Sequence, residues 1–277
     1  MNIRRLLALL PLLLAVAPVQ AQIEVLCRPI HSHFLIGEES TVRVEVRNQT
    51  STPLIIAGSN RNAKVSFELT TETGSAVPAK RELPFAVSDI IKPGQEWIRA
   101  VDLQPFFDLR NTGRLKLRAV VEWDGNAYLS AKSFFNIERG VEIVKRTVSS
   151  GTGPEKVMIK YSLRTVAREE GEILFLCLEH PDTHTRFAAA NLGTMIRLYV
   201  PHLLRDSGGR IHVLHQSAPN RFTHSEISAA GRMLNQEHFS NDYQMPEMKE
   251  LEGTIIVRGR PYIPGDERRM PLGPDVR

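Results

Sequence analysis

The fold is decided by three segments: PHLLRDSGGRIHVLHQ (residues 201–216), FTHSEISAAGRMLNQEHF (222–239) and PEMKELEGTIIVR (246–258). The first and third share a plan, in which a proline precedes a short apolar segment, a glycine turn and an alternating strand. Pro201 aligns with Pro246, and Gly209 with Gly253, at an offset of about 45 residues, which is typical of β-propeller blades and other β arrays. We therefore expect repeated, blade-like antiparallel units in the second half of the chain.

The sequence before these segments adds two strands to the same half. Residues 157–166 and 173–178 read as strands, whereas 188–193 is a run of small residues that we interpret as a helical turn. About two blades fit between Val157 and Arg258, but a closed propeller needs at least four. We expect a small open sheet assembly whose edges are covered by the other half of the chain or by another chain.

The first half alternates apolar and polar residues in short runs separated by turn residues. About seven such runs at regular spacing over roughly 115 residues are typical of an antiparallel β-sandwich. Asp124-Gly125 is a hairpin signal between two of the runs. The expected strands are residues 41–47, 54–56, 65–69, 97–101, 115–123, 128–131 and 134–137.

Two segments of this half resemble the immunoglobulin-like (Ig-like) accessory domains of bacterial envelope and secreted proteins. They are GEESTVRVEVRNQTSTPL (residues 37–54) and FDLRNTGRLKLRAVVEW (107–123). The resemblance implies an Ig-like sandwich and says nothing of function, because such sandwiches have many roles. A Cys…Trp…Cys core is absent, so the resemblance does not extend to antibody-type domains.

The N-terminus predicts export. Arg4 and Arg5 precede an apolar run, and small residues stand near Ala21, as in a cleavable signal peptide. We expect a signal peptide at 1–21, an Ig-like sandwich at 22–140, a blade-like domain at 141–260 and a flexible proline-rich tail at 261–277. A flexible loop or linker is expected at 149–154. The alternative to a cleavable signal peptide is an uncleaved anchor, but Pro18 and Gln20 cut the apolar run short of a membrane-spanning length, and no later segment is apolar enough to span a membrane. From the export signal we expect a periplasmic or extracellular location.

Charge is nearly balanced over the 277 residues. The chain has 35 Lys and Arg against 31 Asp and Glu, a formal charge of +4. We find no dense Lys/Arg stripe with interleaved aromatic residues, so nucleic acid is not expected as a partner.

The two cysteines, Cys27 and Cys177, leave two alternatives open. An exported protein can keep a disulfide, which here would join the two halves of the chain. The alternative is a pair of buried thiols, favoured by the apolar run ILFLCL around Cys177.

Motifs that carry chemistry are few. Seven of the nine histidines lie in the second half, and His31 and His33 lie in the first. His180 and His184 have metal-ligand spacing, but Pro181 makes the segment a turn, and His212 and His215 fall on opposite faces of one strand. We find no nucleophile elbow, HExxH, P-loop or dinucleotide motif, and predict no catalytic, cofactor or metal residues.

Two function classes remain open. The favoured one is a non-catalytic envelope or secreted protein that binds another protein. The alternative is a carbohydrate- or cell-wall-binding protein related to propeller hydrolases. Asp206-Ser207-Gly208-Gly209 is similar to the aspartate-containing turns of sialidase-like blades, but it lacks the aromatic residue that completes those motifs, so an ordinary turn is the favoured interpretation. That alternative would need exposed aromatic rings, with Tyr199, Phe222, Tyr243 and Tyr262 as the candidates.

Overall fold

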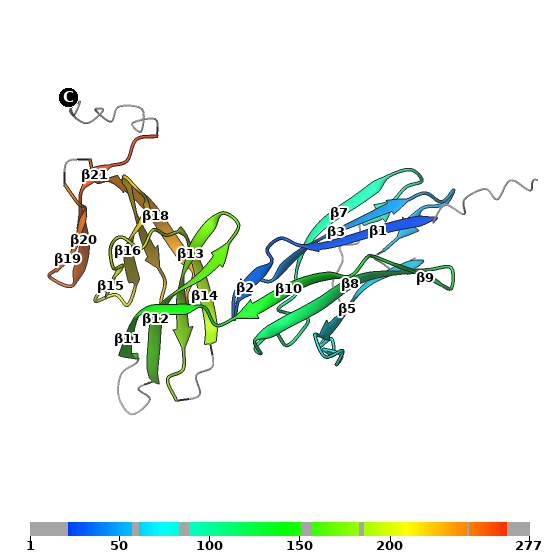
Figure 1. Cartoon of the computed structure of the whole chain (residues 1–277), viewed down its shortest axis with the longest axis horizontal. Coiled ribbons are helices and arrows are strands. Elements are labelled where there is room, and N and C mark those ends of the chain that lie inside the picture. Colours follow the sequence, from blue (N-terminus) through cyan, green and yellow to red (C-terminus); the bar gives the residue numbers. More distant parts are fainter. Residues whose placement is uncertain are drawn as a thin grey trace, which may run out of the picture.

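Every element of the computed structural model is a β-strand, in agreement with the predicted all-β class. The structure describes residues 22–56, 61–82, 89–150, 157–182, 186–242 and 244–264. The predicted signal peptide and residues 265–277 of the predicted tail lie outside these ranges. Figure 1 shows an elongated molecule with two groups of sheets, the N-terminal half (residues 22–138) and the C-terminal half (residues 141–264).

Two main sheets build the N-terminal half. One has the order β1 (Ile23–Pro29), β3 (Thr41–Asn48), β7 (Glu96–Asp102). The other has the order β2 (His33–Leu35), β10 (Ser133–Glu138), β8 (Gly113–Trp123), β5 (Ala63–Thr71), with β9 (Asn126–Leu129) also on β8. A two-stranded sheet joins β4 (Leu54–Ile55) to β6 (Ile90–Ile91). The predicted strands are therefore present.

Alternation along the strands puts one face of each sheet into a shared core. Val42, Val44 and Val46 of β3 are fully buried, while the residues between them are more exposed. They pack in one continuous cluster with Leu117 of β8 and Phe135 of β10, from the opposite sheet. The apolar pattern of period two thus becomes a two-layer sandwich.

The C-terminal half also has two main antiparallel sheets. The first has the order β11 (Val141–Ser150), β12 (Val157–Arg168), β13 (Gly171–Glu179), β14 (Arg186–Thr194). The second has the order β15 (His202–Arg205), β16 (Ile211–Ala218), β17 (Arg221–Ile227), β18 (Met233–Ser240), β21 (Arg260–Pro261). Apolar residues of both sheets, such as Leu176 and Val213, form a common core cluster. A hairpin of β19 (Glu247–Leu251) and β20 (Thr254–Arg258) completes this half.

Two local predictions are wrong. Residues 188–193 form part of β14 and not a helical turn, because this segment pairs along its length with the apolar strand β13. The predicted linker at 149–154 begins inside β11, whose last residues Ser149 and Ser150 pair with β12. Residues 151–156 of that prediction lie outside the described ranges.

The 45-residue correspondence relates only one pair of hairpins, β15–β16 and β19–β20. Gly209 lies in the turn between β15 and β16, and Gly253 in the turn between β19 and β20, both with positive φ. The two turns touch through a hydrogen bond from the Ser207 amide to the Gly253 carbonyl of 2.8 Å. However, β19 and β20 form a sheet of two strands. Met248 and Ile255 of this hairpin pack with Leu214 of β16, so the hairpin covers a face of the larger sheet.

A buried ion pair and an apolar cluster join the two halves. Arg168 of β12 contacts both carboxylate oxygens of Glu38, at 2.5 and 2.6 Å, and its side chain is only 2% exposed. Leu35 of β2 packs in one cluster with Phe175 and Cys177 of β13. The halves are also linked covalently through residues 139 and 140, between β10 and β11.

The cysteines belong to different clusters. Cys27 lies in the sandwich core of the N-terminal half, and Cys177 lies in the cluster at the junction. No disulfide joins them, and both are buried. Burial raises the pKa of the Cys27 thiol to about 12.

Candidate functional site

An exposed apolar loop stands between β14 and β15. Leu198, Tyr199 and Val200 are 69%, 45% and 70% exposed. The base of the loop is fixed, because Met195 is buried and the Ile196 amide donates to the Gln216 carbonyl at 2.9 Å. The sequence MIRLYVP thus anchors its first apolar residues and presents the later ones to solvent.

The loop opens into a small cavity of about 140 Å³. The Tyr199 ring lies 5.8 Å from the ring of buried Phe222 of β17, measured between centroids. We name this cavity the Tyr199 pocket. Its lining residues are Tyr199, Val200, His202, Leu214, His215, Gln216, Phe222, Met245 and Pro246.

Two buried polar side chains line the Tyr199 pocket. Gln216 donates from Nε2 to the Pro219 carbonyl at 2.8 Å, and its Oε1 has no partner among the described residues. His215 Nε2 lies 3.1 Å from the Thr194 carbonyl, so this nitrogen carries the hydrogen. Its Nδ1 then has a lone pair, also without a partner in the described chain. Since neighbouring residues of a strand face opposite ways, only Gln216 shares the face of Leu214 and Phe222, and its Oε1 is the acceptor beside the apolar rings of the pocket.

His215 is neutral at neutral pH. Burial lowers its pKa from 6.5 to about 4, and the bond to Thr194 only partly opposes that shift. The residue is 1% exposed. A neutral imidazole keeps the acceptor nitrogen available, which a charged imidazolium would not.

A second group of polar residues lies on the face of the β15–β18 sheet that carries Leu214, Gln216 and Phe222, opposite to His215. The rings of His212 and His224 stack with centroids 5.3 Å apart, and Nδ1 of His212 is 3.1 Å from Nε2 of His224. His212 Nε2 lies 3.4 Å from Asp206 Oδ2, and Arg210 Nε lies 2.7 Å from the same oxygen. Burial, and then the charge of His212, lower the pKa of His224. The side chains of Asp206, His212 and His224 are thus held by contacts with one another and with Arg210, on the side of the sheet that faces β19 and β20.

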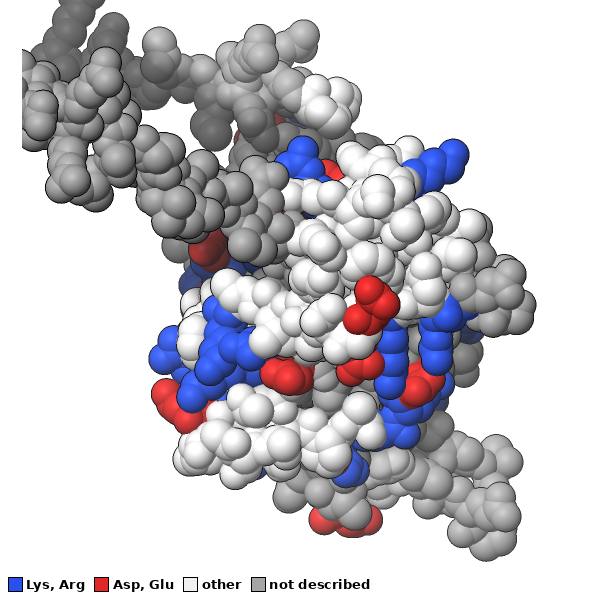
Figure 2. Space-filling view, turned by 90° about the vertical axis from the view of Figure 1, so that its right-hand side faces the viewer, with Lys and Arg blue, Asp and Glu red and all other residues white. Residues whose placement is uncertain are grey.

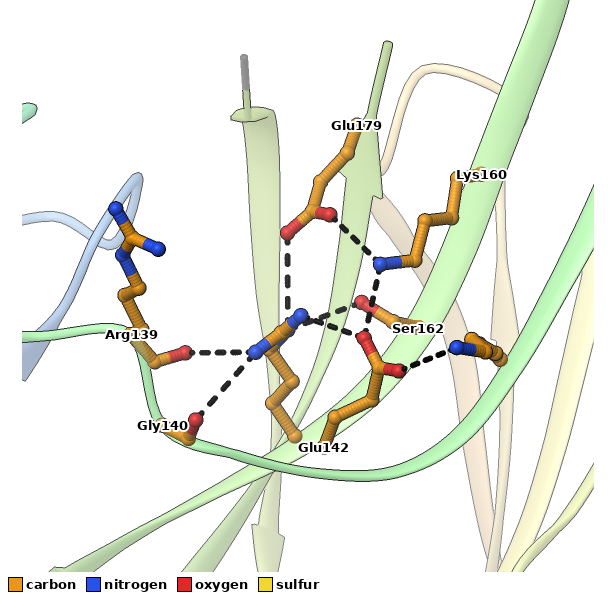
Figure 3. A network of polar contacts seen from close by, with 8 residues as sticks. Arg139, Gly140, Glu142, Lys160, Ser162 and Glu179 are labelled. Carbon is orange, nitrogen blue, oxygen red and sulfur yellow. Dashed lines mark hydrogen bonds and ion pairs between the residues drawn. The ribbon is translucent and has the colours of Figure 1, made fainter. Parts of the chain in front are cut away.

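A charged network crosses strands β11, β12 and β13 (Figure 3). Lys160 lies 2.9 Å from Glu142 and 3.3 Å from Glu179, so it bridges two carboxylates. Arg164 lies 2.6 Å from Glu142 and 3.6 Å from Glu179. Burial acts to raise the pKa of Glu142, but the bond from Lys160 and the charge of Arg164 outweigh it, and the pKa is lowered. Since cations and anions satisfy each other, this network holds β11 in place.

The other histidines that the structure describes are spread over the molecule. His33 contacts Glu138, and His31 lies 4.0 Å from Glu170. Over the described ranges, no cluster of three or more His, Cys, Asp or Glu is placed to hold a metal ion. His184, the second residue of the HxxxH spacing, lies outside those ranges. His212 and His215 do face opposite sides of β16, as predicted.

The aromatic residues divide in two groups. Trp97 is buried in β7, and Trp123 of β8 packs against the same sandwich core. Phe222 is buried, Tyr262 is half-buried beneath Arg221, and Tyr199 is exposed. Tyr243 lies outside the described residues. The sequence placed Tyr199 among its candidates, but it did not bring together the pocket residues of β16, β17 and residues 245–246.

Charge on the surface is mixed. Figure 2 shows blue and red side chains interspersed among white ones on the face it draws. In the part of the chain that the structure describes, no helix is long and apolar enough to cross a membrane. No protein-family model matches this chain, and comparison with the curated proteins finds no relative.

Proposed function

We propose that this chain is a non-catalytic exported protein that binds another protein in the periplasm or at the cell surface. The observation that carries the proposal is the exposed run Leu198-Tyr199-Val200 beside the Tyr199 pocket. Apolar residues exposed together, next to a pocket, are characteristic of protein–protein contacts.

The chemistry of the loop fits an interface. Tyrosine and methionine are enriched at the centres of interfaces, and Tyr199 and Met245 both line this pocket while remaining 45% and 40% exposed. Tyr199 is already oriented against Phe222, so little conformational entropy would be lost on binding. The unpaired Oε1 of Gln216 would favour a partner that inserts a donor, such as a hydroxyl or amide group.

We further propose that the N-terminal half is an Ig-like sandwich. Support comes from the strand order, in which β1, β3 and β7 face β5, β8 and β10, as strands A, B and E face C, F and G in Ig-like domains. The first strand also changes sheets, since β2 pairs in parallel with β10. The C-terminal half is proposed to consist of two blade-like units, supported by two successive four-stranded meanders, β11–β14 and β15–β18.

The experiment replaces Val200 by Asp in the full chain. Tagged wild-type and V200D proteins are cross-linked in their native envelope and purified. We expect wild type to recover one protein at near-equal amount, and V200D to lose it at least tenfold, because a charge would be buried in the contact. Leu129→Asp is the matched control, because Leu129 is 48% exposed in the N-terminal half.

Two results would count against the proposal. One is recovery of the same partner by wild type and V200D. The other is recovery of no protein at stoichiometric amount by wild type. Circular dichroism of V200D must match wild type, which shows that the variant is folded.

Carbohydrate binding is the second candidate, and one observation favours it. Tyr199 presents an exposed ring in a pocket that the Gln216 side chain also lines, an arrangement that suits a sugar with an apolar face and hydroxyl groups. The burial of Phe222 and Trp97 leaves fewer rings for stacking. Retention of the wild-type protein, but not of Tyr199→Ala, on cell-wall polysaccharide would favour this candidate over the first.

A further inference from the structure

A second cavity lies between the two sheets of the C-terminal half, at the side where β11 and β15 form their edges. Its volume is about 300 Å³. We name it the Tyr161 pocket. Its lining residues are Arg146, Val148, Tyr161, Leu203, Leu204, Arg205, Asp206, Ile211 and Glu250.

The Tyr161 hydroxyl lies in this cavity without a partner. Tyr161 of β12 is 2% exposed, and its oxygen makes no hydrogen bond to any described residue. Burial raises the pKa of Tyr161, an effect that the charge of Arg205 partly opposes, so the hydroxyl keeps its hydrogen at neutral pH. A buried donor without an acceptor disfavours folding, so this hydroxyl is expected to serve a ligand.

Arg205 supplies a second unused donor. Its Nε is buried and has no partner among the described residues. Its guanidinium also lies over the β15–β16 turn, with Nη2 3.1 Å from where a Cβ on Gly209 would stand. A cation and a hydroxyl that share one cavity, each with an unused hydrogen, form a site for an anion.

Arg146 adds a second positive charge, at the solvent-exposed opening of the Tyr161 pocket. It is the cross-strand partner of Tyr161 in the β11–β12 pair, and it is exposed. Within the described chain we find no ion pair for Arg146 or for Arg205.

Two carboxylates, those of Asp206 and Glu250, also line the Tyr161 pocket, and their negative charge opposes the binding of an anion. Asp206 is committed to Arg210, which contacts it through the backbone amide at 2.8 Å and through Nε at 2.7 Å. Its Oδ2 also faces His212 at 3.4 Å. Glu250 of β19 is exposed and stands at the solvent side. With Asp206 neutralised by Arg210, the two arginines outweigh the one remaining carboxylate.

We propose that the Tyr161 pocket binds a small oxyanion, a carboxylate or a phosphate group, between the Tyr161 hydroxyl and the Arg205 guanidinium, with Arg146 at the mouth. This site is separate from the Tyr199 pocket, since the two share no lining residue. The proposal therefore stands or falls independently of the partner-binding loop.

The test is thermal unfolding of the full chain during titration with sodium phosphate or sodium acetate at pH 7. Sodium chloride keeps the ionic strength constant, so general salt effects cancel. We expect one oxyanion to raise the unfolding temperature in a saturable way, as a ligand of the folded state does. A response to phosphate alone indicates a tetrahedral anion, and a response to acetate alone indicates a carboxylate.

Two variants identify the site. Tyr161→Phe removes only the hydroxyl and should weaken the apparent affinity about tenfold, while Arg205→Gln should abolish the saturable response. In chloride buffer without phosphate or acetate, Tyr161→Phe should unfold at or above the wild-type temperature, because its hydroxyl has no partner to lose. Arg232→Gln, an exposed arginine on the β17–β18 turn, should behave as wild type.

Three outcomes would overturn the proposal. The first is no saturable rise with either anion, and the second is an undiminished rise in both variants. The third is a lower unfolding temperature of Tyr161→Phe in chloride buffer without phosphate or acetate, which would show that the hydroxyl already makes a hydrogen bond in the protein.

Discussion

The two halves of the molecule differ in how many polar side chains they bury, with few in the N-terminal half and many in the C-terminal half. The N-terminal half has one continuous apolar cluster between its sheets, with residues such as Val44, Leu117 and Phe135. In the C-terminal half the β15–β18 sheet carries apolar clusters on both faces and, between them, many buried polar residues. These are Asp206, His212, His215, Gln216, Ser217, Asn220, Thr223, His224, Ser225 and Ser240.

The difference shows where binding is to be sought. Burying a polar group without a hydrogen bond lowers the stability of the fold, so unpaired buried polar atoms are candidates for binding a ligand. Many of the buried polar groups are satisfied internally, as where Thr223 donates to Ser217 at 2.7 Å and Gln236 donates to Ser225 at 3.1 Å. The exceptions in this half, on Tyr161, Arg205, His215 and Gln216, all belong to residues that line a cavity.

The largest expected effect comes from breaking the junction between the halves. Arg168→Met leaves the Glu38 carboxylate buried without its cation, and should lower the free energy of unfolding by about 3–5 kcal/mol. Both tryptophans lie in the N-terminal half, so tryptophan fluorescence reports on that half, while far-ultraviolet circular dichroism reports on the whole. We expect the two urea transitions to separate in the variant.

The double variant Glu38→Gln/Arg168→Met is the control for the junction. It removes both buried charges, so it should recover part of the free energy of unfolding that Arg168→Met loses. Equal midpoints for Arg168→Met and wild type would show that the ion pair does not stabilise the contact.

The next effect should appear only in the C-terminal half, on acidification. Below pH 6.5 the unfolded chain protonates His215, whereas the folded chain does not until about pH 4. Acid therefore favours the unfolded state, and the free energy of unfolding should fall by about 3 kcal/mol between these pH values, with no contribution above 6.5. His224 and His238, whose pKa values are also lowered by burial, act in the same direction.

The measurement is urea unfolding at several pH values for wild type and His215→Gln. The variant should be less stable at pH 7 but should lose less on acidification. A wild-type slope in His215→Gln would assign the acid sensitivity to other groups.

The smallest effect comes from Gly140, at the covalent link between the halves. Its φ is +69°, and a Cβ there would stand 2.7 Å from Leu35 Cδ1 and 2.9 Å from the Thr165 carbonyl. Gly140→Ala should cost about 1–3 kcal/mol from strain and crowding together. Gly125→Ala has a similar φ of +72° with no atom nearby, so the difference between the two variants isolates the crowding. Equal losses would mean that the junction relaxes around the new methyl group.

The sequence predicted most strands because each depends on local alternation. The run TVRVEVR shows the pattern of β3 directly. The pattern fails where small residues form the strand, as at 188–193 in β14. There the close approach of Ala188 to the Gly231 turn requires small side chains, since a Cβ on Gly231 would stand 2.7 Å from that of Ala188. Such tertiary requirements override local propensity.

The candidate sites were less accessible to sequence reasoning. Tyr161 and Arg205 lie in different sheets, so no spacing in the chain relates them. The stacking of His212 on His224 depends on the register of β16 against β17. Tyr199 could be named as an aromatic candidate, but its exposure follows from the anchoring of Met195 and Ile196 below it.

The junction also has a mechanical consequence. The covalent link at residues 139–140 lies beside the noncovalent contacts of the junction, since Gly140 adjoins Leu35 and Arg168 pairs with Glu38. Under tension the peptide chain carries the load, whereas the ion pair and the Leu35 cluster resist bending. A covalent link alone would let the halves turn about it, and the side-chain contacts oppose that turning. The elongated arrangement in Figure 1 is then maintained by these side-chain contacts as well as by the peptide link.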